Sequence, residues 1–444
     1  MLSKLKSYLK PLPDAVNPIT DTKIIAKKYK YWRIRMFLGM YISYLVFYLI
    51  RKGLPSVAPF FKEELHLTNM EYGILGSTMA VTYGVGKFLS GLLVDRCSIR
   101  SFLAIGLLGS SITTLFFGFF SSLPVLTFLW GLNGAFQSTG FPSCAKGIVY
   151  WFSQNERGTY WTLHSSSKTG GIALIGLMST LFIWAGHWRY TFSIPALLGV
   201  IVSVLLFFTL TDKPQCVGLP PIDIYRNDTN NVKVEMGKDT SHWEILTKYV
   251  FGNPYLWIVA ISAMLLYFVR FTMLDWSTIF MTEDRGISKT TAASLLLFMP
   301  LAGVLGGISC GIISDKIFKG RCLPASITYL LFLLLSLYGM FNFVDPHTSW
   351  WHMALILSAV GFFVEGPQSV AMGVLIARLS PKEAIGAATG FVGIFEYAGT
   401  FLAGVAAAAI ISKFQWIGIF KSAGIACAAV ILLLLLIIKK DKGN

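Results

Sequence analysis

Two stretches of the chain share one pattern: LGSTMAVTYGVGKFLSGLLVDR, from Leu75 to Arg96, and FMPLAGVLGGISCGIISDK, from Phe298 to Lys316. Each is a mostly apolar run of about 20 residues, the length that crosses a hydrocarbon core about 30 Å thick. Each run ends in glycine, three further residues, aspartate and a basic residue. Inside a bilayer such a run must be helical, because every backbone N–H and C=O needs a partner within the segment. The two stretches therefore predict transmembrane helices that share one sequence pattern.

Similar apolar runs recur along the whole chain, in which 55% of the 444 residues are hydrophobic and 13% are charged. A soluble globular chain carries about 25% charged residues. The alternating pattern of an outer-membrane barrel is missing. We therefore expect an all-α membrane protein with twelve spans, at roughly 34–53, 71–94, 101–120, 123–151, 160–184, 189–211, 254–280, 290–318, 322–344, 350–378, 386–411 and 414–438.

The twelve spans form two related halves. Arg51 precedes Asp95 by 44 residues, and Arg270 precedes Asp315 by 45 residues. Matching offsets of two unlike features indicate an internal duplication, which many transporters use. The predicted organisation is two pseudo-symmetric six-helix bundles, with an N-terminal segment (1–33), the first half (34–211), a polar linker (212–253), the second half (254–438) and a tail (439–444).

Basic residues cluster before the first span and after the last, and the formal net charge is +15. Lysine and arginine close to spans stay on the cytoplasmic side, so we expect both termini there. Since topology explains this charge, no nucleic-acid partner is expected. Six scattered cysteines without a C-x-x-C pair predict neither a disulfide framework nor a metal site. No nucleophile–base pair or nucleotide motif is present, so neither an enzyme nor a cofactor is expected.

Several motifs resemble one known family. The pattern G-x-x-x-D-R-x-x-x-R, from Gly91 to Arg100, is similar to the loop signature of the major facilitator superfamily and implies its fold. The segments that resemble the organophosphate:phosphate antiporter family within it are Phe47–Lys52, Tyr83–Phe88, Asp212–Pro220, Tyr267–Arg270, Leu274–Trp276 and Gly386–Phe391. The resemblance extends from about Tyr31 to about Leu435 and is greatest to the bacterial hexose-phosphate transporter and sensor branch. It implies exchange of a sugar phosphate or glycerol phosphate for inorganic phosphate across a bacterial plasma (inner) membrane.

Arg51 and Arg270 are the predicted phosphate ligands. An arginine within a span costs about 2.5–3.5 kcal/mol on insertion scales, so it must face a wet cavity or a partner. Its planar guanidinium binds phosphate oxygens in pairs. One such residue from each half would meet across the pseudo-symmetry axis, and the resemblance implies the same role for both. As alternatives, Arg51 snorkels to the outer headgroups and Arg270 pairs with Asp275.

Three further side chains are candidates for the site in the first half. His164 and Lys168 lie four residues apart on the fifth span and so share one helix face. Lys168 is predicted to contact phosphate or to line the cavity floor; the alternative is that it reaches the interface or pairs with a carboxylate. The resemblance implies a phosphate-binding role for Lys87. The histidine of the family lies one turn further along, near Ser167, so the role of His164 stays open.

Glu365 and Glu396 depart from the family, which usually has an aromatic residue at the first position and small residues at the second. Carboxylates at bilayer depth need partners, and Lys87 or Lys168 are the opposite charges considered. The two glutamates would bind sugar hydroxyls or couple transport to protons. Alternatively, Glu396 neutralises a lysine structurally.

Other candidates fall into two groups. The residues predicted to contact sugar or to take part in coupling are Tyr48, Tyr267, Asp275, Trp276 and Gln137. The residues predicted to form a cytoplasmic gate are Asp95, Arg96, Arg100, Asp315 and Lys316.

The predicted function is uptake of a sugar phosphate in exchange for inorganic phosphate by alternating access. Glucose 6-phosphate is the favoured substrate. Two uncompensated arginines in the empty site would repel each other and oppose closure, which gives strict exchange. One alternative is a membrane sensor that signals to a partner histidine kinase. The other is a proton-coupled symporter that uses Glu365 and Glu396. The chain is expected to act as a monomer in the lipid bilayer.

Overall fold

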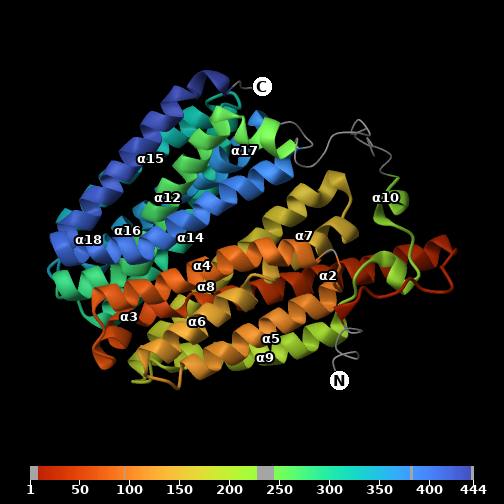
Figure 1. Ribbon diagram of the computed structural model, residues 1–444, viewed down its shortest axis with the longest axis horizontal. Coiled ribbons are helices and arrows are strands. Elements are labelled where there is room, and N and C mark those ends of the chain that lie inside the picture. The colour runs from red at the N-terminus through yellow and green to blue at the C-terminus, as the bar shows by residue number, and fades with distance from the viewer. Residues whose placement is uncertain (1–8, 95, 228–244, 381–383, 442–444) are drawn as a thin grey trace. The chain divides into compact units, whose positions relative to one another are not determined.

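The computed structural model describes residues 9–94, 96–227, 245–380 and 384–441. Within these ranges the chain consists of helices joined by turns and irregular segments, with no strand (Figure 1). The helices before the linker are α2 (Thr22–Arg51), α3 (Gly53–Glu64), α4 (Asn69–Val94), α5 (Ile99–Phe117), α6 (Leu123–Gln137), α7 (Gly140–Trp151), α8 (Gln154–Trp184) and α9 (Tyr190–Thr209).

The linker residues that the structure describes form three short helical segments, η1 (Pro214–Val217), α10 (Ile222–Tyr225) and η2 (Ile245–Phe251). The segments after the linker are α12 (Pro254–Ile279), η3 (Phe280–Asp284), α13 (Lys289–Leu296), α14 (Phe298–Lys316), α15 (Cys322–Phe343), α16 (Trp350–Pro367), η4 (Gln368–Met372), α17 (Gly373–Leu379), α18 (Ile385–Leu436) and η6 (Ile438–Lys440).

Nine helical segments of the described chain are long and apolar enough to cross a membrane. One of them, Ala387–Leu436, corresponds to two passes, because Gln415 breaks it with non-helical backbone at φ 60° and ψ −170°. The remaining two predicted spans are also helical: α4 has 26 residues, and α6 and α7 follow each other through the fourth span. The predicted all-α fold with twelve passes is therefore confirmed.

The first pass is longer than its sequence predicts. Asp21 caps the start of α2 by accepting hydrogen bonds from the backbone N–H groups of Lys23 and Ile24. The pass continues through α3 to Glu64, whereas the predicted span ends at 53. The charged pair at Arg51 and Lys52 suggests an end in the sequence, but the apolar residues after it extend the helix. Arg51 is therefore an interior residue of the pass.

Contacts divide the chain into two units. Unit 1 comprises Met1–Gly53, Val81–Ile175 and Arg189–Lys233, and unit 2 comprises Leu54–Ala80, Gly176–Trp188 and Val234–Asn444. Unit 2 thus combines the second half of the chain with parts of α3, α4 and α8 from the first half. The boundaries of the duplicated halves stay a prediction, since they concern repetition in the sequence rather than contacts.

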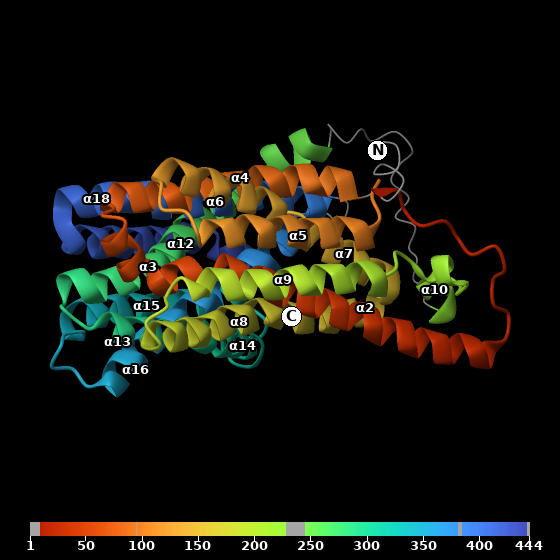
Figure 2. The ribbon, with the colours of Figure 1, turned by 90° about the horizontal axis from the view of Figure 1, so that it is seen from below.

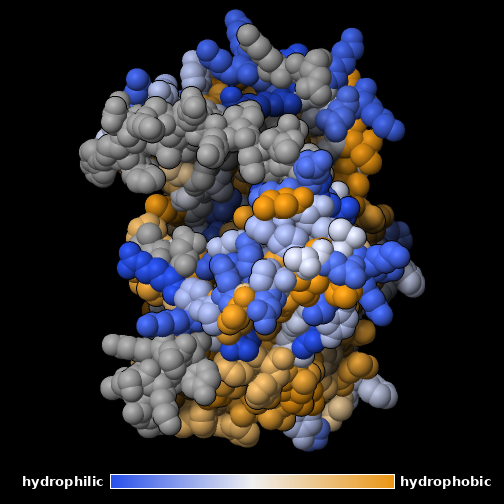
Figure 3. Space-filling model, turned by 90° about the vertical axis from the view of Figure 1, so that its right-hand side faces the viewer, coloured by the Kyte–Doolittle hydropathy of each residue, from blue (hydrophilic) through white to orange (hydrophobic). Residues whose placement is uncertain are grey.

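In unit 1, α5 and α9 lie side by side, as both ribbon views show (Figures 1 and 2). Its core includes Met40, Phe47 and Trp151, each at most 1% exposed. The N-terminal segment and the linker also pack together, because the Tyr29 ring stacks on that of Tyr225 with the centroids 4.0 Å apart. The face that carries α10 and the start of α2 has abundant hydrophilic side chains (Figure 3), as a surface in water requires.

In unit 2, glycines let helices approach closely. A Cβ atom at Gly306 would lie 1.9 Å from the carbonyl oxygen of Phe362, and one at Gly361 would lie 2.0 Å from that of Met299. The backbones of α14 and α16 are therefore in direct contact, the packing that small residues permit inside membranes. This packing fixes the register of α16, the helix that carries Glu365.

Candidate functional site

Arg51 lies in unit 1 at the junction of α2 and α3, with 8% of its surface exposed. Its guanidinium carbon is 4.2 Å from the ring centre of Tyr83 and 5.8 Å from that of Tyr48. An aromatic face attracts a cation by about 0.5–1 kcal/mol at exposed sites and by more when water is excluded. Snorkelling of Arg51 to outer headgroups does not hold, because the side chain is buried and α3 adds 12 residues beyond it.

The other basic candidates of unit 1 are at least partly buried. The Lys87 ammonium lies 4.7 Å from the ring centre of Phe141, and Lys168 is half-buried on α8. His164 is 2% exposed, and its ring centre lies 4.8 Å from that of Tyr44. Its Nε2 atom is buried without a hydrogen-bond partner in the described part of the chain. Unit 1 therefore has polar groups able to bind an anion or a hydroxyl; contact with phosphate stays a prediction.

Arg270 lies in unit 2 and forms an ion pair with Glu365. Arg270 Nη2 is 2.6 Å from Glu365 Oε2, and the two side chains are 14% and 16% exposed. Arg270 Nη1 also donates a hydrogen bond to Gln368 Oε1. Gln368 Nε2 in turn donates to the hydroxyl of Tyr267, over 2.8 Å. Arg270 and Tyr267 of α12 are thus bonded to Glu365 of α16 and Gln368 of η4. These bonds fix the guanidinium between the three elements.

This ion pair differs from what the sequence suggested. The sequence offers Asp275 as the alternative partner of Arg270, and Lys87 or Lys168 as partners of Glu365. Arg270 is a partner of Glu365 that the sequence analysis missed. The two residues are 95 positions apart, and no local pattern indicates that α12 and α16 bring them together.

Two residues predicted to contact sugar, Gln137 and Trp276, are buried and form hydrogen bonds to neighbouring helices. Gln137 is 3% exposed, and its Nε2 donates to the backbone oxygen of Phe47 and to Ser110 Oγ. Trp276 is 2% exposed, and its indole N–H donates to the backbone oxygen of Ala403 over 2.8 Å. Their contact with a sugar stays a prediction.

The remaining predicted contacts lie on three helices. Tyr48 packs on Tyr44 in α2, with ring centres 5.3 Å apart. Asp275 of α12 accepts a hydrogen bond at its backbone oxygen from the Tyr72 hydroxyl. Glu396 is half-buried on α18. A role for each in binding or coupling also stays a prediction.

Of the predicted gate residues, Asp95 lies outside the described residues. Arg96 is exposed, and so are Asp315 and Lys316 at the end of α14. The Arg100 guanidinium lies 4.9 Å from the ring centre of Phe207. Because Arg96 and Arg100 belong to unit 1 and the α14 residues to unit 2, the gate stays a prediction.

Two aspartates that the sequence analysis did not assign fasten the helix ends. Asp212 Oδ1 accepts hydrogen bonds from Ser98 Oγ over 2.8 Å and from the Arg100 backbone N–H over 3.3 Å. Asp441 Oδ2 accepts from the Leu323 backbone N–H over 2.7 Å. Each aspartate follows the last helix of its half and holds the start of the third. The repeated position after a final span is a sequence signal that points to both.

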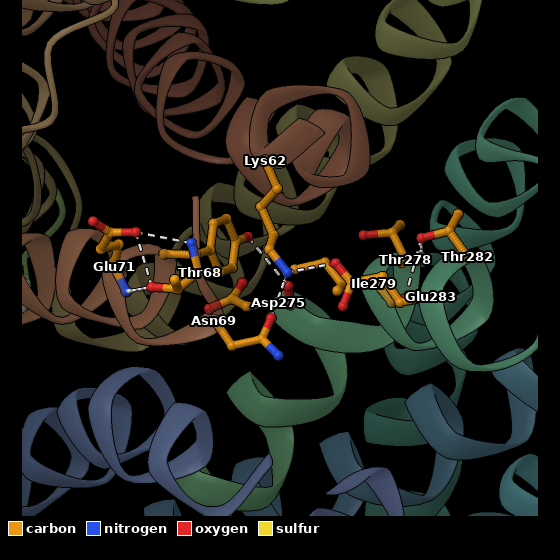
Figure 4. A network of polar contacts seen from close by, with 10 residues as sticks. Lys62, Thr68, Asn69, Glu71, Asp275, Thr278, Ile279, Thr282 and Glu283 are labelled. Atoms are coloured by element: carbon orange, nitrogen blue, oxygen red, sulfur yellow. Dashed lines mark hydrogen bonds and ion pairs between the residues drawn. The ribbon is translucent and has the colours of Figure 1, made fainter. Parts of the chain in front are cut away.

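A polar network joins first-half and second-half segments within unit 2 (Figure 4). The ammonium of Lys62, near the end of α3, is bonded to Glu283 of η3 and to the side chain of Asn69 at the start of α4. Close by, Thr278 donates to the backbone oxygen of Pro55 over 2.8 Å. The sequence gives no sign of this network, since its predicted first span ends before Lys62.

Comparison with known proteins identifies the family. A sequence profile of the Major Facilitator Superfamily matches residues 40–347 and 320–444. The chain belongs to the Major Facilitator Superfamily. A probable hexose phosphate transport protein of Chlamydia pneumoniae is 36% identical over 434 residues, which cover 96% of this chain and 95% of that protein. The membrane sensor protein UhpC of Salmonella typhimurium is 36% identical over 436 residues, covering 98% and 97%.

Solved structures agree with the major facilitator fold. A bacterial homologue of the human lysosomal transporter Spinster has a TM-score of 0.68 at 16% identity, covering 92% of this chain and 95% of its own. Identity at that level shows the fold alone. The relatives confirm the predicted resemblance to the organophosphate:phosphate antiporter family. The chain is therefore a multi-pass membrane protein with bacterial relatives.

Proposed function

We propose that the protein takes up a sugar phosphate in exchange for inorganic phosphate by alternating access. Glucose 6-phosphate is the favoured substrate. The observation that carries this proposal is a pair of buried or half-buried arginines, Arg51 and Arg270, one in each half of the chain. Aromatic rings hold the first guanidinium, and a carboxylate with an amide holds the second. The name of the Chlamydia relative, which refers to hexose phosphate transport, supports the choice of substrate.

Binding would use the planar forks of the two guanidinium groups. Each can donate two parallel hydrogen bonds to phosphate oxygens. Lys87 and Lys168 would add positive charge on the unit 1 side. His164, Tyr48, Tyr267 and Glu396 would bind the sugar or take part in coupling.

The proposed setting is a bacterial plasma (inner) membrane with both termini in the cytoplasm. Exposed lysines at the start of α2, including Lys27, Lys28 and Lys30, support this orientation, because basic residues near a span stay inside. Arg96, Arg100, Asp315 and Lys316 would then belong to a cytoplasmic gate, with Asp95 beside them. We expect a monomer.

The test is uptake of labelled glucose 6-phosphate into vesicles that contain the purified protein. Wild type should accumulate the label when the vesicles contain inorganic phosphate, and Arg51→Ala or Arg270→Ala should abolish that uptake. Lys27→Ala, an exposed site outside the proposed cavity, is the control. Thermal melting should show that all variants remain folded. Uptake that is unchanged in both arginine variants would contradict the proposal.

A second candidate function is a membrane sensor for sugar phosphates. The sensor protein of Salmonella typhimurium favours it, because its 36% identity equals that of the transport protein. A sensor would bind glucose 6-phosphate with little flux and would signal to a partner such as a histidine kinase. Binding by wild type without measurable uptake would select this candidate.

A further inference from the structure

The phosphate-binding surface proposed for Arg270 is already occupied by an anion of the protein itself. Glu365 Oε2 lies 2.6 Å from Arg270 Nη2, and Gln368 Oε1 accepts a hydrogen bond from Nη1. A carboxylate offers a guanidinium two oxygens in one plane, as a phosphate group does. An incoming phosphate must therefore share the guanidinium with Glu365 or displace it.

The ion pair compensates Arg270 when no substrate is present. Both side chains are largely removed from water, and an uncompensated buried charge is unfavourable by several kcal/mol. Strict exchange would follow from repulsion between two uncompensated arginines in the empty site. With Glu365 beside Arg270, that repulsion is weaker.

The residues of α14 beside Glu365 are glycines. Gly303 and Gly307 of α14 flank Glu365: a Cβ atom at Gly303 would lie 3.4 Å from Glu365 Cβ, and one at Gly307 would lie 3.7 Å from Glu365 Cγ. These two positions carry no side chain, so neither places one against the stem of Glu365. Arg270 keeps its bond to Gln368, which Tyr267 holds in turn.

We propose that Glu365 is a built-in substitute for the substrate phosphate at Arg270. It neutralises the guanidinium in the empty site and gives way when a phosphate group binds. The inference rests on the proposed function, since Arg270 must be a phosphate ligand. Two consequences follow: Glu365 weakens phosphate binding by competition, and it lets the empty carrier change conformation, so that some net flux accompanies exchange.

The first experiment measures the Kd of inorganic phosphate by calorimetry on purified protein at constant ionic strength. Glu365→Gln keeps the size of the side chain and removes its charge, so it should lower the Kd by about tenfold or more, a typical effect for a close charge pair. Glu156→Gln is the matched control. Glu156 forms an ion pair with Arg33 over 2.7 Å and is not one of the residues proposed to bind substrate. It should leave the Kd unchanged.

The sign of the change separates competition from a structural role. If Glu365 only positioned Arg270, its replacement would raise the Kd. A Kd that is unchanged or raised in Glu365→Gln overturns this proposal. Should that variant fail to fold, Glu365→Asp retracts the carboxylate by one methylene group and should lower the Kd by a smaller factor; an unchanged or raised Kd there overturns the proposal equally.

The second readout is the flux that remains without internal phosphate. In Glu365→Gln this net uptake should fall relative to exchange, because the empty site again carries uncompensated charge; a ratio equal to that of wild type contradicts the proposal. Wild-type protein that binds neither phosphate nor glucose 6-phosphate overturns the proposed function and this inference with it. Phosphate binding by wild type with an unchanged Kd in Glu365→Gln overturns this inference alone.

Discussion

Arg51 and Arg270 are held in different ways. Tyr83 and Tyr48 contact the first guanidinium through their rings, whereas Glu365 and Gln368 bind the second through charge and hydrogen bonds. Both arrangements orient a flat group with several N–H donors. A lysine keeps the charge at either position but lacks the fork that matches two phosphate oxygens.

Arg51→Lys and Arg270→Lys should therefore each weaken glucose 6-phosphate binding. Charge-assisted hydrogen bonds contribute about 1.5–3 kcal/mol, so the Kd should rise roughly 10-fold to 100-fold in either variant. Calorimetric titration of the purified proteins measures this Kd, with Lys27→Arg as a control for an arginine–lysine exchange at an exposed site. Wild-type affinity in either lysine variant would show that charge alone suffices and that the fork is not used.

The sequence could identify these two arginines, because a charged residue within an apolar run stands out against the cost of burying it. It could not identify the partner of Arg270. That depends on the register of α12 against α16, which side-chain packing sets, including the close approach at Gly306 and Gly361. Nor could it show that Gln137 and Trp276 form hydrogen bonds to neighbouring helices, since those bonds become visible only in three dimensions.

Among the helices, the pass formed by α2 and α3 connects the two units. Its first part, to Gly53, packs in unit 1, and the rest packs in unit 2. The Lys62 network ties the second part to η3. In an alternating-access carrier, first-half and second-half segments must separate at this end to admit substrate. The network is therefore expected to stabilise the state in which this end is closed.

Lys62→Gln or Glu283→Gln should shift the protein toward opening at this end. Glu283 is 40% exposed, so the ion pair contributes up to about 1 kcal/mol and the shift should be at most about fivefold. The readout is the rate at which a cysteine introduced at the buried Thr278 reacts with a membrane-impermeant maleimide, after the six native cysteines have been replaced.

The exchanged pair, Lys62→Glu with Glu283→Lys, should return the labelling rate toward that of the parent protein. Lys27→Gln changes an exposed residue of unit 1 and should leave the rate unchanged. Equal labelling rates in the parent and in both single variants would mean that this ion pair does not contribute to closure.

At the scale of the whole molecule, both halves have an aspartate that follows the last helix of the half. Asp212 and Asp441 each bind the start of the third helix of their half, which fits an internal duplication. Twelve passes could be read from apolar runs, because length and hydropathy are local properties. Which segments belong to each of the two units could not be predicted, since that depends on which helices pack together.

We propose that Arg51 and Arg270 bind one phosphate group together. The most direct measurement is an experimental structure of the protein with bound glucose 6-phosphate. We expect a single phosphate whose oxygens lie about 2.7–2.9 Å from nitrogen atoms of both guanidinium groups. A phosphate that contacts neither arginine, or two phosphates held separately by one arginine each, would show that the two arginines do not bind one phosphate together.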